Sequence, residues 1–369
     1  MARFLFTQFQ NVELIVENGN PIGGAVVETM VWINSLHENG HEIDQFKYAN
    51  DKRVKLSNYG FIKLFPVYHP TKGIRWLRWP LYRLPNIYKA IKRSKPDYLY
   101  ASIPGWASYY IALFCRKLGV KMILRVANDN MLDERIKITH SKFDQIFIAK
   151  AFKLADFISV QNEFQYQTLK KQFPDKKILK IYNPIKIDKS KNIVKKEMKG
   201  YLAWVANFRY QKNLKQLFEI ASTFPDEKIK IAGIPLKNMD DETKEYLEKL
   251  KELSNVEFVG KVPREEIFNF LSKAKYLLST SRYEGFSNTF LEAMVVGTPI
   301  LTPTLVNPDG IIDRFNLGIT YQNATDLKSS FNKLTVDEYI KISSNTIQFV
   351  NNNHDHLVLG KKLVNFLKE

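Results

Sequence analysis

The sequence predicts an α/β protein built from two doubly wound domains, and three observations support this fold class. The 369 residues exceed what one hydrophobic core normally serves, so two domains of ordinary size are expected. Short β-rich runs alternate with longer amphipathic segments, a pattern typical of parallel sheets covered by helices. The alternation then begins again after a hydrophilic, lysine-rich stretch at residues 186–200.

The first half of the chain supplies the first series of elements. Apolar runs predict strands at residues 3–8, 42–47, 97–102, 121–126 and 157–160. Helical patterns follow near residues 24–38, 86–94, 105–118, 142–154 and 162–172. The single cysteine, Cys115, stands among apolar residues of one predicted helix. This position predicts a buried thiol, and one cysteine excludes an intramolecular disulfide.

The second half repeats the pattern and ends in helices. Strands are predicted at residues 201–206, 228–233, 256–260, 276–280 and 299–303, and the last stretch, 336–369, reads as two helices. We therefore expect a first domain, a linker, a second domain and a C-terminal helix, at residues 1–185, 186–199, 200–350 and 351–369. Doubly wound sheets bind ligands beyond the carboxyl ends of their strands.

The distribution of apolar residues along the chain predicts neither a targeting segment nor a membrane-spanning one. The N-terminus has only a short apolar run before polar residues, which predicts a first strand and not a signal peptide. No run of about 18 consecutive apolar residues occurs, so no membrane-spanning helix is expected.

Positive charge is concentrated in the first half. The net charge is +17, and residues 1–183 hold 28 Lys and Arg against 15 Asp and Glu. No acidic residue stands between Asp51 and Asp97, where basic residues alternate with aromatic ones such as Trp76 and Trp79. Such a segment suits an anionic membrane surface or nucleic acid, and a solvated face without a partner is the third possibility.

The most informative motif is RYEGFSNTFLEAMVVGTP at residues 282–299, in which seven residues separate Glu284 from Glu292. A helix beginning at Asn288 or Thr289 would present unpaired backbone N–H groups that can hold a diphosphate. Carboxylates accept hydrogen bonds from sugar hydroxyl groups, so the implied ligand is a nucleotide sugar. The alternative is a simple favourable contact between an acid and the helix dipole.

This segment resembles the E-x7-E signature of the retaining, family-4 glycosyltransferases of GT-B architecture. The resemblance continues at four other places: PIGGAVVETMVWINSLHENGHEI (21–43), LADFISVQNEF (154–164), YNP (182–184) and WVANFRYQKNL (204–214). It implies two Rossmann-like domains that face each other across a cleft. It also implies that 154–164 holds the last strand of the first domain, that 182–184 is a hinge and that the final helix returns to the first domain.

The same resemblance implies a donor site in the second domain. Lys212 is the candidate cation for the departing diphosphate, because charge develops there in the transition state. The common Gly-Arg step of the family is Ala206-Asn207 here, so Arg209 or Asn207 would replace the usual phosphate-binding arginine. The full donor set is Gly24, Asn207, Arg209, Lys212, Phe286, Ser287, Asn288, Thr289 and Glu292, with Glu284 orienting the sugar hydroxyl groups and Glu292 holding the ribose.

The acceptor side departs from the family in a second way. A histidine often follows the fourth strand, but this chain reads LRVANDNMLDER at residues 124–135. Asn128 or Asp129 occupies that neighbourhood, and Asp129 could act as a general base for the acceptor. A turn-forming role is the alternative for Asp129, while His140 stands too far along the chain.

The activity implied by the resemblance is transfer of a sugar from a nucleotide-diphosphate sugar to a lipid-linked oligosaccharide, with retention of configuration. Bacterial O-antigen, capsule or other surface-glycan synthesis is the implied setting, on the cytoplasmic face of the membrane and attached through residues 52–95. No metal, cofactor or nucleic-acid partner is expected, since the chain has no Asp-x-Asp pair. The alternatives are a GT-B nucleotide-sugar epimerase and a basic nucleic-acid-binding protein.

Overall fold

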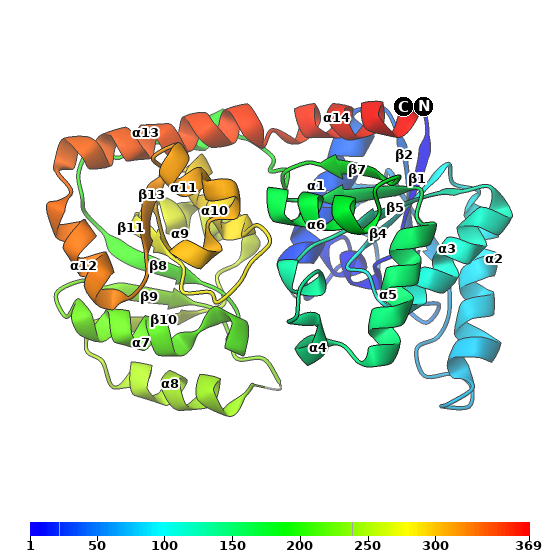
Figure 1. Ribbon diagram of the computed structural model, residues 1–369, viewed down its shortest axis with the longest axis horizontal. Helices are drawn as coiled ribbons and strands as arrows, with labels where there is room; N and C mark the ends of the chain where they lie inside the picture. The colour runs from blue at the N-terminus through cyan, green and yellow to red at the C-terminus, as the bar shows by residue number, and fades with distance from the viewer. Residues whose placement is uncertain (22, 238) are drawn as a thin grey trace. The chain divides into compact units, whose positions relative to one another are not determined.

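Two parallel β-sheets, one in each half of the chain, organise the fold (Figure 1). The computed structural model describes residues 1–21, 23–237 and 239–369. These residues divide into unit 1, Met1–Pro184 with His356–Glu369, and unit 2, Ile185–Asp355. The two doubly wound domains predicted from the sequence are therefore confirmed.

Unit 1 contains a seven-stranded parallel sheet in the order β3-β2-β1-β4-β5-β6-β7. Its register is clear at β1, where Phe4 pairs with Ile43 on one side and with Tyr98 on the other. The strands are β1 (Arg3–Phe6), β2 (Glu42–Lys47), β3 (Ile62–Pro66), β4 (Tyr98–Ser102), β5 (Lys121–Arg125), β6 (Phe157–Val160) and β7 (Lys177–Lys180).

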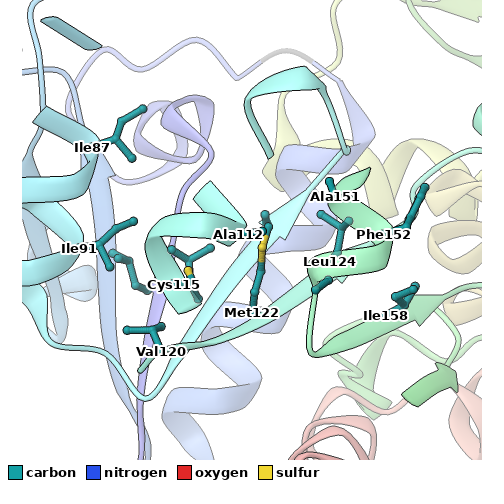
Figure 2. Packing of buried hydrophobic residues seen from close by; sticks show 14 of the residues in the cluster. Ile87, Ile91, Ala112, Cys115, Val120, Met122, Leu124, Ala151, Phe152 and Ile158 are labelled. Atoms are coloured by element: carbon teal, nitrogen blue, oxygen red, sulfur yellow. The ribbon is translucent and has the colours of Figure 1, made fainter. Parts of the chain in front are cut away.

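Helices cover both faces of this sheet, so unit 1 has three layers. They are α1 (Gly24–Glu38), α2 (Leu84–Ser94), α3 (Trp106–Leu118), α4 (Ile136–Thr139), α5 (Lys142–Leu154), α6 (Glu163–Gln172) and α14 (His356–Lys368). Figure 2 shows one core, in which Ile87 of α2, Cys115 of α3 and Phe152 of α5 gather over Leu124 of β5. Cys115 has no exposed surface, which confirms its predicted burial.

The second core of unit 1 lies on the opposite face of the sheet. There α1 contributes Met30, Trp32 and Ile33, and α14 contributes Leu359 and Leu363. The C-terminal helix is thus an integral part of unit 1, where it packs directly against α1 (Figure 1).

Unit 2 contains a six-stranded parallel sheet in the order β10-β9-β8-β11-β12-β13. The order reverses between β8 and β11, which pair with Leu277 opposite Ala203. The strands are β8 (Tyr201–Val205), β9 (Ile229–Ala232), β10 (Val256–Gly260), β11 (Ala274–Leu278), β12 (Ile300–Pro303) and β13 (Gly318–Tyr321).

The helices of unit 2 are α7 (Leu214–Thr223), α8 (Asp241–Lys251), α9 (Ile267–Ser272), α10 (Asn288–Val295), α11 (Ile311–Arg314), α12 (Ala324–Lys333) and α13 (Val336–Asn353). Side chains of α7, α8 and α12 share a core with Trp204 and Tyr276 of the sheet. The lysine-rich segment expected to be a linker belongs to unit 2. Its Asn192 Nδ2 donates to the Val295 carbonyl at 2.8 Å, and its Lys195 N–H donates to Ser343 Oγ at 2.8 Å.

The predicted strands are confirmed with shifts of at most two residues, but three strands were missed. The missed strands β3, β7 and β13 each lie at the edge of a sheet. All three are short, β3 and β7 carry lysine, and β13 begins with glycine, so their apolar signal is weak. The expectation that 154–164 holds the last strand of the first domain was therefore wrong, because β7 follows β6 and pairs with it. Among the described residues, no helix is both long and apolar enough to cross a membrane.

Candidate functional site

The strand order of unit 2 identifies where a ligand site is expected. Loops that follow β8 and β11 leave the carboxyl ends of two adjacent strands at the point where the order reverses, and such switch points hold ligands in doubly wound sheets. Lys212 ends a 3₁₀ turn, η6 (Tyr210–Lys212), after β8. Glu284 stands in the loop after β11.

Lys212 and Glu284 form an ion pair at this switch point. Both side chains are largely buried, with exposed fractions of 15% and 10%. Ser281 Oγ also donates to Glu284 Oε1 at 2.9 Å, and Thr280 Oγ1 donates to the Lys212 carbonyl at 2.7 Å. The structure therefore brings together the predicted diphosphate cation and the predicted sugar carboxylate, and it holds each with a neighbouring hydroxyl group.

Further contacts tie the two loops to each other. Gln211 Nε2 donates to the Tyr283 carbonyl, and the Arg282 N–H donates to the Gln211 carbonyl, both at 2.8 Å. The Arg282 guanidinium lies 3.9 Å from the centre of the Tyr210 ring. Such contacts limit the movement of Lys212 relative to Glu284, which a preorganised charged site requires.

Helix α10 begins at Asn288 with Ser287 as its N-cap, which confirms the predicted helix start. Ser287 Oγ and Thr289 Oγ1 lie 2.8 Å apart at this end of the helix. Phe286 is buried, with its ring 5.1 Å from the ring of His354. A short loop thus separates Glu284 from the polar N-terminus of α10. A helix N-terminus favours the binding of an anion.

Glu292 lies inside α10 and is buried, with 3% of its surface exposed. Its carboxylate forms an ion pair with Arg264, which belongs to the 3₁₀ turn η7 (Arg264–Glu266) after β10. Burial raises the pKa of Glu292, and the Arg264 guanidinium opposes that rise. Arg264 was missed in the sequence analysis, and its place beyond the carboxyl end of a strand is the signal that could have identified it.

The two candidates for the missing phosphate arginine differ in exposure. Asn207 is half-buried, two residues after the end of β8, whereas Arg209 is exposed at the N-cap of η6. Arg209 is therefore the accessible cation on the loop that carries Lys212. Within the described part of the chain, no group of three or more His, Cys, Asp and Glu side chains is arranged to hold a metal ion.

In unit 1, Asp129 lies in the loop that follows the carboxyl end of β5. Its Oδ1 accepts hydrogen bonds from Asn162 Nδ2 at 2.9 Å and from Gln165 Nε2 at 2.8 Å. Burial raises the pKa of Asp129 in spite of these two donors. The neighbouring Asn128 is half-buried and precedes the 3₁₀ turn Asp129–Met131. The carboxylate is thus held by the N-cap residue and one residue of α6, which the sequence analysis did not identify as its partners.

The glycine loop of unit 1 leads into α1 from the end of β1. Gly24 is the first residue of α1, and Gly23 has a φ of 93°, a conformation that favours glycine. Ile22 of the same PIGG motif lies outside the described residues. The neighbouring strand β4 is followed by Ile103 with a φ of 59°. A β-branched residue in the left-handed region is strained, and such strain concentrates at functional sites.

The basic segment 52–95 has two parts with different environments. Arg53 is paired with Glu13 at 2.6 Å and with Asp51 at 2.8 Å, so its charge is compensated. By contrast, Trp76 is 86% exposed, and Arg75 beside it is also exposed. The first part also exposes Val54, but the second part exposes the four consecutive residues Ile74–Leu77 and so holds the denser mixture of cations and apolar side chains.

Comparisons with known proteins agree with this architecture. Residues 186–349 match the family model of the glycosyl transferases group 1. A stretch of 114 residues is 27% identical to glycosyltransferase 1 domain-containing protein 1 of Xenopus tropicalis. That match covers 30% of this chain and 33% of the relative, so it spans a third of the relative's length.

Solved structures resemble the chain over its whole length. Sucrose-phosphate synthase from Thermosynechococcus elongatus superposes with a TM-score of 0.79 at 13% identity, covering 100% of this chain and 98% of that one. HepE of Anabaena, solved with UDP and glucose, gives 0.75 at 15% identity with full coverage of both chains. The lipopolysaccharide outer core galactosyltransferase WaaB gives 0.66 at 20% identity, covering 100% and 99%. The chain thus has the GT-B fold, and its residues 186–349 are similar to the glycosyl transferases group 1 family.

Proposed function

We propose that the protein is a glycosyltransferase that moves a sugar from a nucleotide-diphosphate sugar to an oligosaccharide acceptor. The observation that carries this proposal is the ion pair of Lys212 and Glu284, which lies at the switch point of unit 2 beside the N-terminus of α10. A cation, a carboxylate and a helix N-terminus are the three groups that a charged diphosphate and a polyhydroxylated sugar need.

Breaking the bond between the anomeric carbon and the diphosphate leaves negative charge on the departing phosphate. Lys212 and the N–H groups at the start of α10 stabilise this charge as it develops, with Arg209 as the accessible second cation. Glu284 accepts hydrogen bonds from hydroxyl groups of the sugar and keeps Lys212 oriented. Phe286, Ser287, Asn288 and Thr289 line the same end of the helix.

Glu292 binds the ribose hydroxyl groups in this proposal. Arg264 competes with these hydroxyl groups for the Glu292 carboxylate. The carboxylate already accepts from the Arg264 guanidinium. A carboxylate has about four lone-pair positions, so ribose hydroxyl groups share it with the guanidinium or replace the guanidinium. Arg264 would in either case lie next to the nucleotide.

The acceptor hydroxyl oxygen attacks the anomeric carbon from the side that the diphosphate leaves, so configuration is retained. The acceptor proton passes to the leaving phosphate oxygen, which balances the reaction without a metal ion or cofactor. Asp129 is the alternative proton acceptor, with Asn128 beside it for a hydroxyl group of the acceptor. The raised pKa of Asp129 supports a role in holding a proton, because a catalytic acid or base works best near the ambient pH.

The solved relatives support the class of donor and the setting. HepE was solved with UDP and with UDP-glucose, so uridine diphosphate sugars are the first donors to test. WaaB is named for the lipopolysaccharide outer core, which supports a lipid-linked acceptor in surface-glycan synthesis. The enzyme would then work on the cytoplasmic face of the membrane, attached through the basic residues of 52–95.

Thermal melting against a panel of nucleotide diphosphates and nucleotide sugars tests the donor site directly. A ligand at about one hundred times its dissociation constant adds about 2.7 kcal/mol of stability. We expect one nucleotide to raise the melting temperature selectively and to the same extent with and without Mg²⁺. If no nucleotide raises the melting temperature, unit 2 does not hold a donor and the proposal is wrong.

Product analysis then separates transfer from the alternatives. Incubation of the selected donor with a lipid-linked oligosaccharide should give a product one sugar longer, with the anomeric configuration of the donor. A rearranged nucleotide sugar without any acceptor would instead identify an epimerase. Binding of oligonucleotides with no effect of nucleotide sugars would identify a nucleic-acid-binding protein.

A further inference from the structure

Unit 1 carries two groups of exposed apolar side chains that lie far apart in the sequence, among other such side chains that stand singly. The first group lies at the π-helical turn η3 (Arg78–Arg83) and the loop before it, where Ile74, Trp76 and Leu81 are 65%, 86% and 70% exposed. The second group lies on α5, where Phe143 and Ile146 are 53% and 54% exposed. Phe143 and Ile146 are three residues apart on a helix, so they share one face.

A series of ring contacts joins the two groups. The Trp79 and Trp106 rings lie 4.6 Å apart, and the Trp106 and Phe143 rings lie 6.1 Å apart. Phe143 in turn contacts Phe147 at 4.4 Å. Helix α3, which carries Trp106, packs between α2 and α5, and Figure 1 shows these three helices side by side. The segments that carry the two groups are therefore neighbours, and we call the surface that they form with α3 the aromatic-basic face.

The charge of the aromatic-basic face is strongly positive. Residues 72–95, 106–118 and 142–154 together hold 13 Lys and Arg and a single acidic residue, Asp144. The Asp144 carboxylate accepts a hydrogen bond from Ser141 Oγ at 2.6 Å in the capping box of α5. A surface with this balance is complementary to an anionic partner.

Some of the cations lie directly over aromatic rings. Lys150 Nζ lies 5.3 Å from the centre of the Phe147 ring, and the Arg83 guanidinium lies 4.8 Å from the centre of the Trp79 ring. Cations and rings at this distance attract each other. The positive charge is therefore positioned along the same series of rings that joins the exposed apolar groups.

We propose that the aromatic-basic face binds an anionic lipid bilayer at two insertion points, Trp76 with Leu81 on η3 and its preceding loop, and Phe143 with Ile146 on α5. This inference rests on the membrane attachment in the proposed function and adds a second, unpredicted contact outside residues 52–95. The exposed aliphatic side chains distinguish a bilayer from nucleic acid. Leu81 and Ile146 have no ring on which a base could stack, but both bury apolar area at the acyl boundary of a bilayer.

Two separated insertion points limit the orientation of unit 1 on the bilayer more than one point does. A single point allows unit 1 to tilt in any direction on the bilayer, whereas two points restrict tilting to the axis that joins them. Loss of either point should therefore weaken binding strongly, because the second contact forms at high effective concentration once the first has formed.

Sedimentation with vesicles tests the α5 contact. The full chain is mixed with vesicles of phosphatidylcholine containing phosphatidylglycerol, and the bound fraction is measured for Phe143→Ser/Ile146→Ser and for Trp76→Ser/Leu81→Ser. We expect each double variant to lower the partition coefficient about tenfold or more. The matched control is Leu305→Ser/Val336→Ser, which removes two exposed apolar side chains from unit 2 and should leave partitioning unchanged.

A second double variant of α5 keeps the apolar side chains intact. Lys150→Gln/Lys153→Gln removes two charges from α5 and should weaken binding to anionic vesicles but not to vesicles of phosphatidylcholine alone. Unchanged partitioning of both α5 variants would overturn the second contact. Binding of a single-stranded oligonucleotide is measured for Phe143→Ser/Ile146→Ser as well. If the variant loses oligonucleotide binding as strongly as vesicle binding, the face is assigned to nucleic acid.

The nucleotide-induced melting shift of each variant keeps the two proposals separate. A normal shift with unchanged vesicle binding rejects the α5 contact and leaves the donor site standing. If the variants bind vesicles less well and no nucleotide stabilises even the wild type, the lipid contact is supported and the transferase is rejected.

Discussion

Arg125 Nη2 lies 2.9 Å from Glu28 Oε1, and both side chains are buried within unit 1. The same carboxylate oxygen accepts from Trp32 Nε1 at 3.2 Å, and the guanidinium also donates to Ser159 Oγ at 2.8 Å and to Asn183 Oδ1 at 2.6 Å. One ion pair thus connects α1, β5, β6 and the last residues of unit 1 before its boundary at Pro184. A buried charge is tolerated only when its partners are all present.

Arg125→Met should lower the free energy of unfolding by about 3–5 kcal/mol, because it leaves the Glu28 carboxylate buried without its cation. The double variant Arg125→Met/Glu28→Gln should recover a substantial part of this loss. Urea unfolding measures both. Lys121→Met is the control on the same strand, since its pair with Asp156 is solvent-exposed and contributes about 1 kcal/mol or less. Equal losses for Arg125→Met and Lys121→Met would contradict the prediction.

Gly360→Ala should destabilise the protein, although alanine favours helices over glycine by about 1 kcal/mol. A Cβ at Gly360 of α14 would lie 2.1 Å from Ser35 Oγ of α1, where Ser35 donates to the His356 carbonyl. The two helices would have to separate, at a cost of about 1–3 kcal/mol. Calorimetry measures the change in melting temperature.

Adding Ser35→Ala to Gly360→Ala provides the control for this close approach. Removal of the hydroxyl group leaves Ser35 Cβ at 3.4 Å and Asn39 Nδ2 at 2.8 Å from the new methyl group. The double variant should therefore recover part of the lost stability. A rise in melting temperature for Gly360→Ala alone would show that α1 and α14 are not this close.

Arg264→Met should make the protein less stable as pH rises. Burial already raises the pKa of Glu292 in the folded protein, and loss of the opposing guanidinium raises it further. Between the ordinary carboxyl pKa and the raised value, the folded state binds more protons than the unfolded state, so stability falls with increasing pH. Urea unfolding of Arg264→Met and wild type from pH 5 to pH 8 should show a difference that grows with pH.

Arg282→Met is the matched control for the pH series. Arg282 pairs with Glu242, whose side chain is 35% exposed, against 4% for Glu292. Water can solvate Glu242 once the arginine is removed, so the loss of stability should vary little over the same pH range. A flat difference for Arg264→Met would mean that Glu292 is solvated or paired in another way.

Lys212→Met should slow sugar transfer by about tenfold to a hundredfold, since a charge-assisted hydrogen bond contributes about 1.5–3 kcal/mol. The loss should appear in kcat more than in KM, because the charge on the diphosphate develops in the transition state. Steady-state kinetics with the donor selected by melting measures it. Lys215→Met removes an exposed lysine of α7 three residues away and should leave both constants unchanged.

Much of the candidate site in unit 2 was predictable because it is local in sequence. The helix start at Asn288, the position of Glu284 before it and the cation at Lys212 all follow from motifs shorter than twenty residues. Arg264 was not predictable in this way, because it pairs with a carboxylate 28 positions further along the chain. The donors to Asp129 were missed for the same reason, since Asn162 at the N-cap of α6 and Gln165 on α6 are 33 and 36 positions from it in the sequence.

The sequence by itself determined the alternation of strands and helices, the repetition of that alternation and the local motifs, because hydrophobic periodicity and helix caps act between near neighbours. Tertiary structure alone decided the edge strands β3, β7 and β13, the Arg125–Glu28 and Arg264–Glu292 pairs and the joining of Trp79 to Phe143 through Trp106. These features depend on which distant segments the sheets bring side by side. Strand order and helix packing set that proximity, and no short stretch of sequence encodes it.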